Sequence, residues 1–144
     1  MAETILINSG VVQKRLETTD GKSCDIVFNP TDSFFIEKLF AAFETLDKKQ
    51  EEYAAKIKEK KNNREVFDIA RKMDEEVRDI IREVFDFDVC AALFSTRNVY
   101  AMGDGFPIWA NLLLGIMDEV DTAFAREQKA TNPRVARYTK KYHK

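Results

Sequence analysis

Apolar and polar residues alternate along the first thirty positions, the pattern of strands with one buried face. One alternating run covers residues 12–18 and a second covers residues 24–28. Asp20-Gly21 lies between them, and Asp-Gly flanked by alternating residues is a strong signal for a hairpin. The pattern predicts a β-hairpin at about residues 11–28, with Thr4–Ile7 as a candidate third strand.

After the hairpin the apolar spacing changes to three and four residues, which is typical of a helix with one buried face. The positions with this spacing are Phe35, Leu39, Phe43 and Leu46, with Phe34, Ile36 and Phe40 beside them. Asn29 is suited to the N-cap, Pro30 to the first helical position, and Asp32 to the positive end of the helix. We therefore expect a helix that starts at about Pro30.

Residues 47–61 are mostly charged or polar and keep few positions of that apolar spacing. We expect the helix to continue through them with most of its surface in solvent, supported by pairs such as Glu52 with Lys56. Asn62-Asn63 offers a break at the end of this segment. One continuous long helix through this point is the alternative.

Three more helices follow from the same spacing. The first covers about residues 64–84 and has an apolar face opposite a charged one. A short helix fits residues 88–94. The last is the apolar run of residues 106–120, which opens at Pro107 and continues toward Ala125.

These elements predict a mainly α protein of the α+β kind, with an N-terminal β-hairpin packed on a bundle of about four helices. A chain of 144 residues is long enough for one domain with a substantial core. Within it we distinguish a hairpin subregion at residues 1–29, a helical bundle at residues 30–132 and a basic tail at residues 133–144. Five glycines and three prolines fit helices better than a turn-rich sheet protein.

Charge is unevenly spread along the chain. From Arg126 onward seven basic residues face the single acid Glu127, a net charge of +6, which leaves −8 for residues 1–125. No apolar run approaches the length of a membrane span, and the N-terminus lacks the features of a signal peptide. We therefore expect a cytoplasmic protein with no membrane partner.

Residues 84–105 hold the candidates for chemistry. Asp86 and Asp88 flank Phe87 two residues before Cys90, and Asp104 lies between two glycines. The three aspartates are candidate ligands for Mg²⁺ or Ca²⁺, and Asp86 or Asp88 is a candidate phosphoryl acceptor. They are also suited to capping helices and turning the chain.

The capping interpretation accounts for more residues than either chemical one. The single histidine is His143, close to the C-terminus, so no paired histidine site is expected. Cys90 has no histidine base at hand, and no nucleophile elbow or phosphate-binding glycine motif is present. Cys24 and Cys90 form no metal-binding pair. We predict no catalytic, metal or cofactor site and hence no enzyme.

The order of elements resembles a known family. It comprises a hairpin, the helix start FNPTD at residues 28–32, the segment IREVFDFDVCAALFSTRNVY at residues 81–100, an apolar helix and a basic tail. This order is similar to that of the small tail assembly chaperones of long-tailed phages and prophages of Gram-positive bacteria. Asp86-Phe87-Asp88 stands where that family has glycines, and residues 102–106 look like an insertion.

The resemblance implies a non-catalytic assembly factor in the host cytoplasm. Such a protein binds the helical tape measure protein, keeps its apolar surface from aggregating, and releases it as tail-tube subunits polymerise, which makes the tail-tube protein a second candidate partner. Multimers of the chain itself also fit this role. Aromatic residues beside the glycine turn and on the first helix are the candidate anchors for the partner. These candidate partner-binding residues are Phe35, Phe106, Pro107 and Trp109, with core packing as the alternative for each.

Two other functions remain open from the sequence. A virion structural or completion protein shares the helix-rich composition. A nucleic-acid-binding regulator would use the tail, where Tyr138 and Tyr142 lie among basic residues. Seven basic residues beside an acidic body are few for that purpose, so nucleic acid is the less favoured partner.

Overall fold

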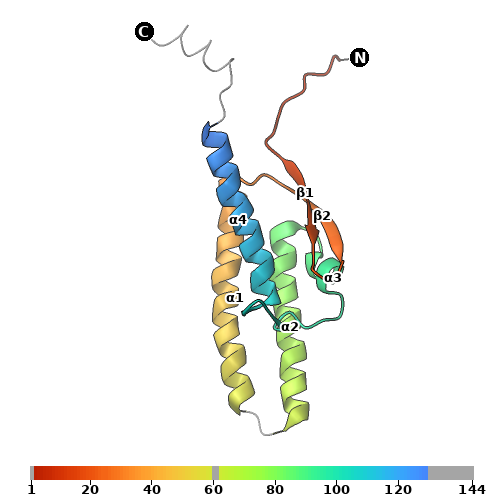
Figure 1. The fold of residues 1–144 in the computed structure, drawn as a ribbon, viewed down its shortest axis with the longest axis vertical. Helices are drawn as coiled ribbons and strands as arrows, with labels where there is room; N and C mark the ends of the chain where they lie inside the picture. The colour runs from red at the N-terminus through yellow and green to blue at the C-terminus, as the bar shows by residue number, and fades with distance from the viewer. Residues whose placement is uncertain (1, 60–61, 130–144) are drawn as a thin grey trace.

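The computed structural model describes residues 2–59 and 62–129 and shows a mainly α protein with a small β component (Figure 1). Its elements are β1 (Val12–Glu17), β2 (Ser23–Phe28), α1 (Ser33–Glu59), α2 (Asn63–Phe85), α3 (Val89–Phe94), β3 (Met102–Gly103), β4 (Phe106–Pro107) and α4 (Ile108–Lys129). In the described residues this gives four helices and an N-terminal hairpin, as the sequence predicts. The basic tail at residues 133–144, with His143, lies outside the described residues.

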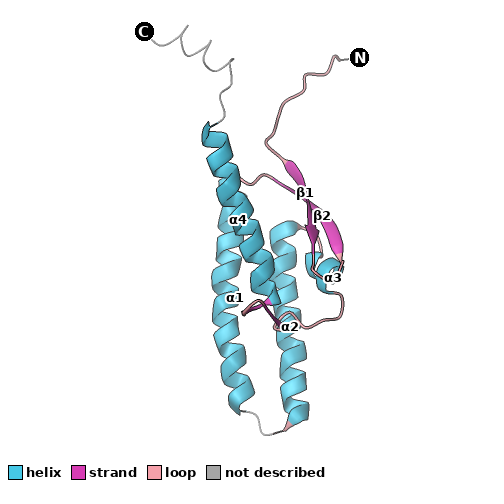
Figure 2. Ribbon diagram, viewed as in Figure 1, coloured by secondary structure: helices cyan, strands magenta, loops and turns pink. Residues whose placement is uncertain are grey.

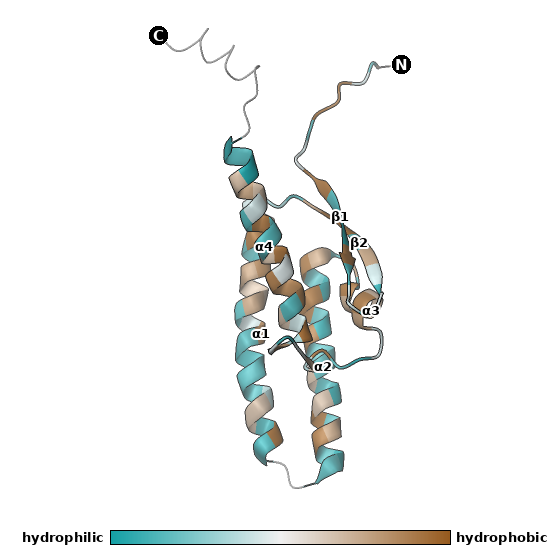
Figure 3. Cartoon of the chain, viewed as in Figure 1, coloured by the Kyte–Doolittle hydropathy of each residue, from teal (hydrophilic) through white to brown (hydrophobic). Residues whose placement is uncertain are grey.

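The helices form the body of the molecule. α1 and α2 run antiparallel as a long helical hairpin, and α4 packs along the N-terminal half of α1 (Figure 2). The β1–β2 hairpin covers the body beside α3 and α4. The C-terminal half of α1 is largely hydrophilic (Figure 3), as expected for a helix that extends past the core into solvent.

One apolar core joins the hairpin to the helices. β2 contributes Ile26 and Phe28, and their buried side chains join those of Leu39 in α1 and Ile81 in α2. Phe28 also packs against the half-buried Phe35, with ring centroids 5.0 Å apart. A two-stranded hairpin is marginally stable in water, so burial against the helices explains why this one forms.

The predicted hairpin is confirmed. β1 and β2 pair antiparallel from Val12 opposite Phe28 to Glu17 opposite Ser23. At the turn, the backbone N–H of Gly21 donates to the carbonyl of Thr18 at 3.0 Å, and Gly21 has φ +90°. Glycine is favoured there because side chains rarely adopt this conformation.

The candidate third strand is wrong. Residues 4–7 form no strand in the described structure; they precede β1 as an exposed segment without regular secondary structure. The apolar composition of Thr4–Ile7 suits a strand, but within the described residues no strand pairs with this segment.

The start of α1 is three residues later than predicted. Asp32 caps the helix: its Oδ1 accepts from the N–H of Phe34 at 3.0 Å, and its carbonyl accepts from the N–H of Ile36. The side chain of Asn29 is engaged elsewhere, because its Oδ1 accepts from the backbone N–H of Thr31. Asn29 therefore forms a turn before the helix rather than its cap.

The break between α1 and α2 is real, so the alternative of one long helix is wrong. Asn62 caps α2, with Oδ1 accepting from the N–H of Glu65 at 2.9 Å and Nδ2 donating to the Glu65 carboxylate at 3.0 Å. This reciprocal arrangement fixes a helix start. α2 then runs back alongside α1 (Figure 1).

The loop before α4 is a second small hairpin that the sequence interpretation missed. β3 and β4 pair through Met102 with Pro107 and Gly103 with Phe106. The turn residues Asp104 and Gly105 have φ +56° and +83°, the positive values required by a tight two-residue hairpin turn. The last helix consequently begins at Ile108, after the proline expected to open it.

None of the helices, as far as the structure describes them, has an apolar stretch of the length needed to cross a membrane.

Candidate functional site

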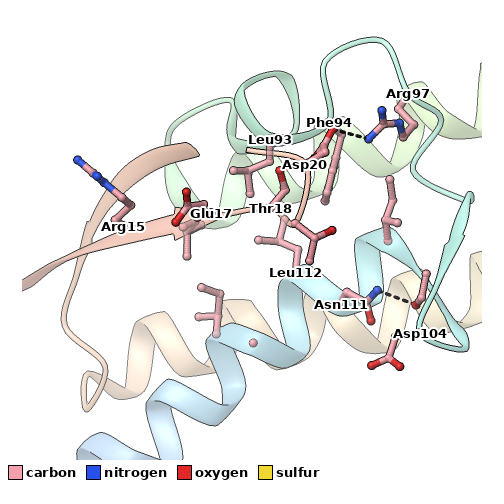
Figure 4. A pocket seen from close by; sticks show the side chains of 16 residues that line it. Arg15, Glu17, Thr18, Asp20, Leu93, Phe94, Arg97, Asp104, Asn111 and Leu112 are labelled. Carbon is pink, nitrogen blue, oxygen red and sulfur yellow. Dashed lines mark hydrogen bonds and ion pairs between the residues drawn. The ribbon is translucent and has the colours of Figure 1, made fainter. Parts of the chain in front are cut away.

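A groove of about 570 Å³ lies between the β1–β2 hairpin and α4 (Figure 4). β1 and its turn form one wall with residues 15–20, and α4 forms the other wall. The end of α3, Arg97 and the β3–β4 turn close the groove at one end. The α4 residues in the wall are Ile108, Asn111, Leu112, Gly115 and Ile116.

The floor of the groove is apolar. Leu93 and Phe94 from α3 and Leu112 and Ile116 from α4 line it, and all four belong to the core cluster. Leu16 of β1 adds a half-buried side chain from the opposite wall. Because these core residues also line an open groove, a bound partner can cover their apolar surface.

The rim of the groove is polar and held in place by hydrogen bonds. Arg97 donates from Nη1 to Oδ2 of Asp20 at 3.0 Å, which ties the hairpin turn to the loop after α3. Thr18 Oγ1 donates to the other oxygen of Asp20 at 2.6 Å. The hydrogen bond from Thr18 and the nearby guanidinium of Arg97 lower the pKa of Asp20. The rim therefore stays charged at neutral pH.

Gly115 leaves an opening in the α4 wall. A Cβ placed on this residue would meet no heavy atom within 4 Å, although Gly115 lies in the middle of a helix, where glycine costs stability relative to alanine. One helical turn away, Asn111 Nδ2 donates to the carbonyl of Gly103 at 2.9 Å and holds the β3–β4 hairpin at the end of the groove. The space beside Gly115 is thus part of the groove and not of the core.

A half-buried hydrogen-bond network fixes the loop that carries Arg97. Asp74 on α2 accepts from Arg78 Nε at 2.9 Å and from the backbone N–H of Val99 at 2.8 Å. Arg78 Nη2 donates to the carbonyl of Arg97 at 2.7 Å, and Asn98 Nδ2 donates to the carbonyl of Ala70 at 2.9 Å. Arg97 and Asn98 therefore have a positioning role, since the hydrogen bonds of this loop set one end of the groove.

The four aromatic and proline anchors expected from the sequence do not gather at this groove. Trp109 is 2% exposed, and its indole N–H donates to Gln50 at 3.0 Å. Phe35 is half-buried between Phe28 and Phe85. Both side chains serve the core in this conformation.

Phe106 and Pro107 lie on β4 instead. Phe106 is 49% exposed and Pro107 is half-buried. They belong to the small hairpin whose Gly103 and Asp104 line the groove. Of the four expected anchors, Phe106 is the one with most surface left for a partner.

Each of the three aspartates has a different structural role. Asp86 ends α2 in the left-handed conformation, with φ +52°. Asp88 caps α3 by accepting from the N–H of Ala91 at 3.1 Å and pairs with Arg82 at 3.2 Å; the backbone hydrogen bond and then Arg82 lower its pKa. Asp104 turns the β3–β4 hairpin. Within residues 2–59 and 62–129, no three His, Cys, Asp or Glu side chains are arranged to hold a metal ion.

Cys90 is a buried thiol. Its burial raises its pKa to about 12 from an ordinary value of 9.0. The thiolate is the reactive form, so we expect native Cys90 to react with iodoacetamide at pH 8 about 1,000-fold more slowly than in urea. Mass spectrometry of the labelled peptide measures this ratio, and fast labelling of the native protein would contradict the buried position.

Because the pKa of Cys90 is raised in the folded state, we expect the free energy of unfolding to fall at alkaline pH. The folded state holds the proton more tightly than the unfolded state, so this contribution is complete below about pH 9 and is lost as the pH rises toward 12. Cys90→Ala should flatten this part of the stability profile.

Sequence reasoning missed the groove because its walls are far apart in the chain. The signal that was available is Gly115, a glycine inside an otherwise continuous apolar helix, which often marks a packing or functional requirement. The partner wall in β1 is set only by the tertiary fold.

Comparison with known proteins adds no family: no protein-family model, no curated protein and no solved structure matches this chain.

Proposed function

We propose that this protein is a non-catalytic assembly chaperone for phage tails, which holds an apolar segment of the helical tape measure protein in the groove between β1 and α4. The observation that carries the proposal is the groove itself, with an apolar floor, a hydrogen-bonded charged rim and the opening at Gly115. The family resemblance supplies the identity of the partner.

The groove has the composition of a polypeptide-binding site. Partner helices are commonly bound by apolar anchors at positions three and four residues apart, and interfaces combine an apolar centre with a polar rim. At about 570 Å³ the groove takes a few such side chains and not a whole helix. The exposed Phe106 and Met102 on the β3–β4 hairpin would extend the contact beyond it.

Weak, repeated contacts of this size suit a chaperone. A tape measure protein offers many amphipathic segments along its length, and several copies of a small binder cover them through multivalent contact. Each copy can then be displaced as tail-tube subunits arrive. We place this activity in the host cytoplasm.

Filling the groove tests the proposal. Gly115→Leu places a branched apolar side chain in open space, so the fold should persist while binding of the tape measure protein weakens by about tenfold or more. Gly115→Ala is the matched control: it improves helix propensity by up to about 1 kcal/mol and leaves most of the groove open. The measurement is co-purification and titration calorimetry with the tape measure protein from the same gene cluster.

Equal binding by the leucine and alanine variants would exclude the groove as the binding site. Mass spectrometry of purified virions tests the role itself. A chaperone is absent from finished particles, whereas a virion structural or completion protein is present in stoichiometric amounts.

A further inference from the structure

The N-terminal arm, residues 2–9, carries three apolar side chains that stay exposed in the part of the chain that the structure describes. Ile5, Leu6 and Ile7 are 83%, 91% and 79% exposed. Three consecutive large apolar residues are typical of a strand that is covered on both faces. The arm is drawn leading away from the helical body (Figure 1). Exposed apolar surface of this kind marks an interaction site.

The direction of the arm is fixed where it leaves the body. Asn29 Nδ2 donates to the carbonyl of Ser9 at 3.0 Å, and Gly10 donates its N–H to Asn8 Oδ1 at 2.9 Å. Gly10 has φ +76°, and a Cβ there would lie 2.6 Å from Asn29 Nδ2. The arm is therefore presented at a defined angle by a position that requires glycine.

The groove offers what such a strand needs. β1 pairs with β2 alone in the described sheet, so its other edge is free. Thr18 hydrogen-bonds with Lys22 across the turn, and the alternation of an antiparallel pair then directs the backbone groups of Gln13, Arg15 and Glu17 to that free edge. Arg15 and Glu17 also line the groove. An added strand would find backbone partners on one side and the apolar floor beneath.

The apolar residues of the arm cannot reach this site on their own chain, because the arm joins β1 directly. If it folded back at Ser9-Gly10 onto its own β1, Ile7 would lie opposite Val12 and Ile5 opposite Lys14. The groove begins only at Arg15 and continues to Asp20. Its apolar residues would thus stop before the groove, whereas the arm of another molecule has no such tether.

We infer that the arm of one copy docks into the groove of a second copy, with residues 4–7 added as a strand along the free edge of β1. Alternation places Ile5 and Ile7 on the same face, toward the floor formed by Leu112 and Ile116. Arm and groove are different surfaces, so each copy can give an arm and accept one. Such head-to-tail contacts build rings or open chains.

Sedimentation velocity of the purified full chain tests this contact. We expect wild type and Gly115→Ala to associate in a concentration-dependent manner. The variant I5S/L6S/I7S, which lacks the apolar arm, and Gly115→Leu, which lacks the open groove, should each associate at least about tenfold more weakly. Circular dichroism verifies that each variant is folded. Association equal to wild type in either folded variant, or a wild type that stays monomeric at all concentrations, would overturn the inference.

Mixing the two variants separates this interface from any other. The serine variant keeps the groove and Gly115→Leu keeps the arm, so together they retain one complementary pair. A 1:1 complex that grows no further is expected. Absence of that complex would also overturn the inference.

The contact has a consequence that rests on the proposed function. Arm and tape measure protein would compete for one groove, so the serine variant should bind the tape measure protein at least as tightly as wild type. If the chain self-associates as expected but the tape measure protein does not bind, the proposed function fails and the interface stands. If the tape measure protein binds but the chain does not self-associate, only the proposed interface is rejected.

Discussion

Trp109→Ala is expected to lower the free energy of unfolding by about 3–5 kcal/mol, the range for removing a large aromatic side chain from a packed core. The side chain is 2% exposed and meets the ring of Phe43 edge-on, with centroids 5.6 Å apart. The change also removes the donor to Gln50 and leaves that amide oxygen to find another partner. A loss of this size is a large share of the stability of a domain.

Urea unfolding followed by far-UV circular dichroism is the measurement, because the variant lacks the single tryptophan that would serve as a fluorescent probe. Phe106→Ala is the matched control, since it truncates a half-exposed aromatic three residues away, on β4 directly before α4. It should cost less than about 1 kcal/mol. A loss below 1 kcal/mol for Trp109→Ala would show that Trp109 is not a core residue.

Asp74→Ala is expected to lower the free energy of unfolding by about 2–4 kcal/mol. The carboxylate is mostly buried and accepts from both Arg78 and the backbone N–H of Val99. Alanine leaves that N–H and the guanidinium without their acceptor. The loop that carries Arg97 would loosen, and with it one end of the groove.

Asp74→Asn separates the contribution of the Val99 hydrogen bond from that of the ion pair with Arg78. The amide oxygen can still accept from the Val99 N–H, whereas the charge is lost. We expect it to cost about half as much as alanine. A double-mutant cycle with Arg78→Met measures the coupling between the two side chains. Additive effects of the two changes would contradict the network.

The sequence was a good guide wherever a pattern is local. The Asp20-Gly21 turn, the helix at Val89–Phe94 with its Asp88 cap, and the start of α2 after Asn62 all depend on residues within a few positions of one another. Local hydrogen bonding and backbone preference decide such features. They could therefore be predicted from the order of residues alone.

Predictions were less accurate where two nearby residues compete for one role. Asn29 and Asp32 are both good helix caps, and the structure uses Asp32 because Asn29 is occupied by Thr31 and Ser9. Asp104-Gly105 carries the same hairpin signal as Asp20-Gly21 but is flanked by strands of only two residues. Strands of two residues are too short to show the alternation of apolar and polar residues that predicts a hairpin.

The groove depended on tertiary structure and could not be predicted. Its walls come from β1 and α4, about a hundred positions apart, and apolar spacing cannot tell a core residue from one that lines an open site. Trp109 is the opposite case, a core residue that the sequence pattern indicated as a partner anchor. Its place beside a glycine turn suggested a partner anchor, whereas packing against Phe43 made it part of the core.

The most direct measurement of the central claim is site-specific photo-crosslinking in cells that produce the tape measure protein. A photoreactive residue at Glu17, on the exposed rim of the groove, should crosslink to the tape measure protein. The same residue at Glu75, an exposed position of α2 outside the groove, should not. Crosslinks from Glu75 with none from Glu17 would contradict a chaperone that binds its partner between β1 and α4.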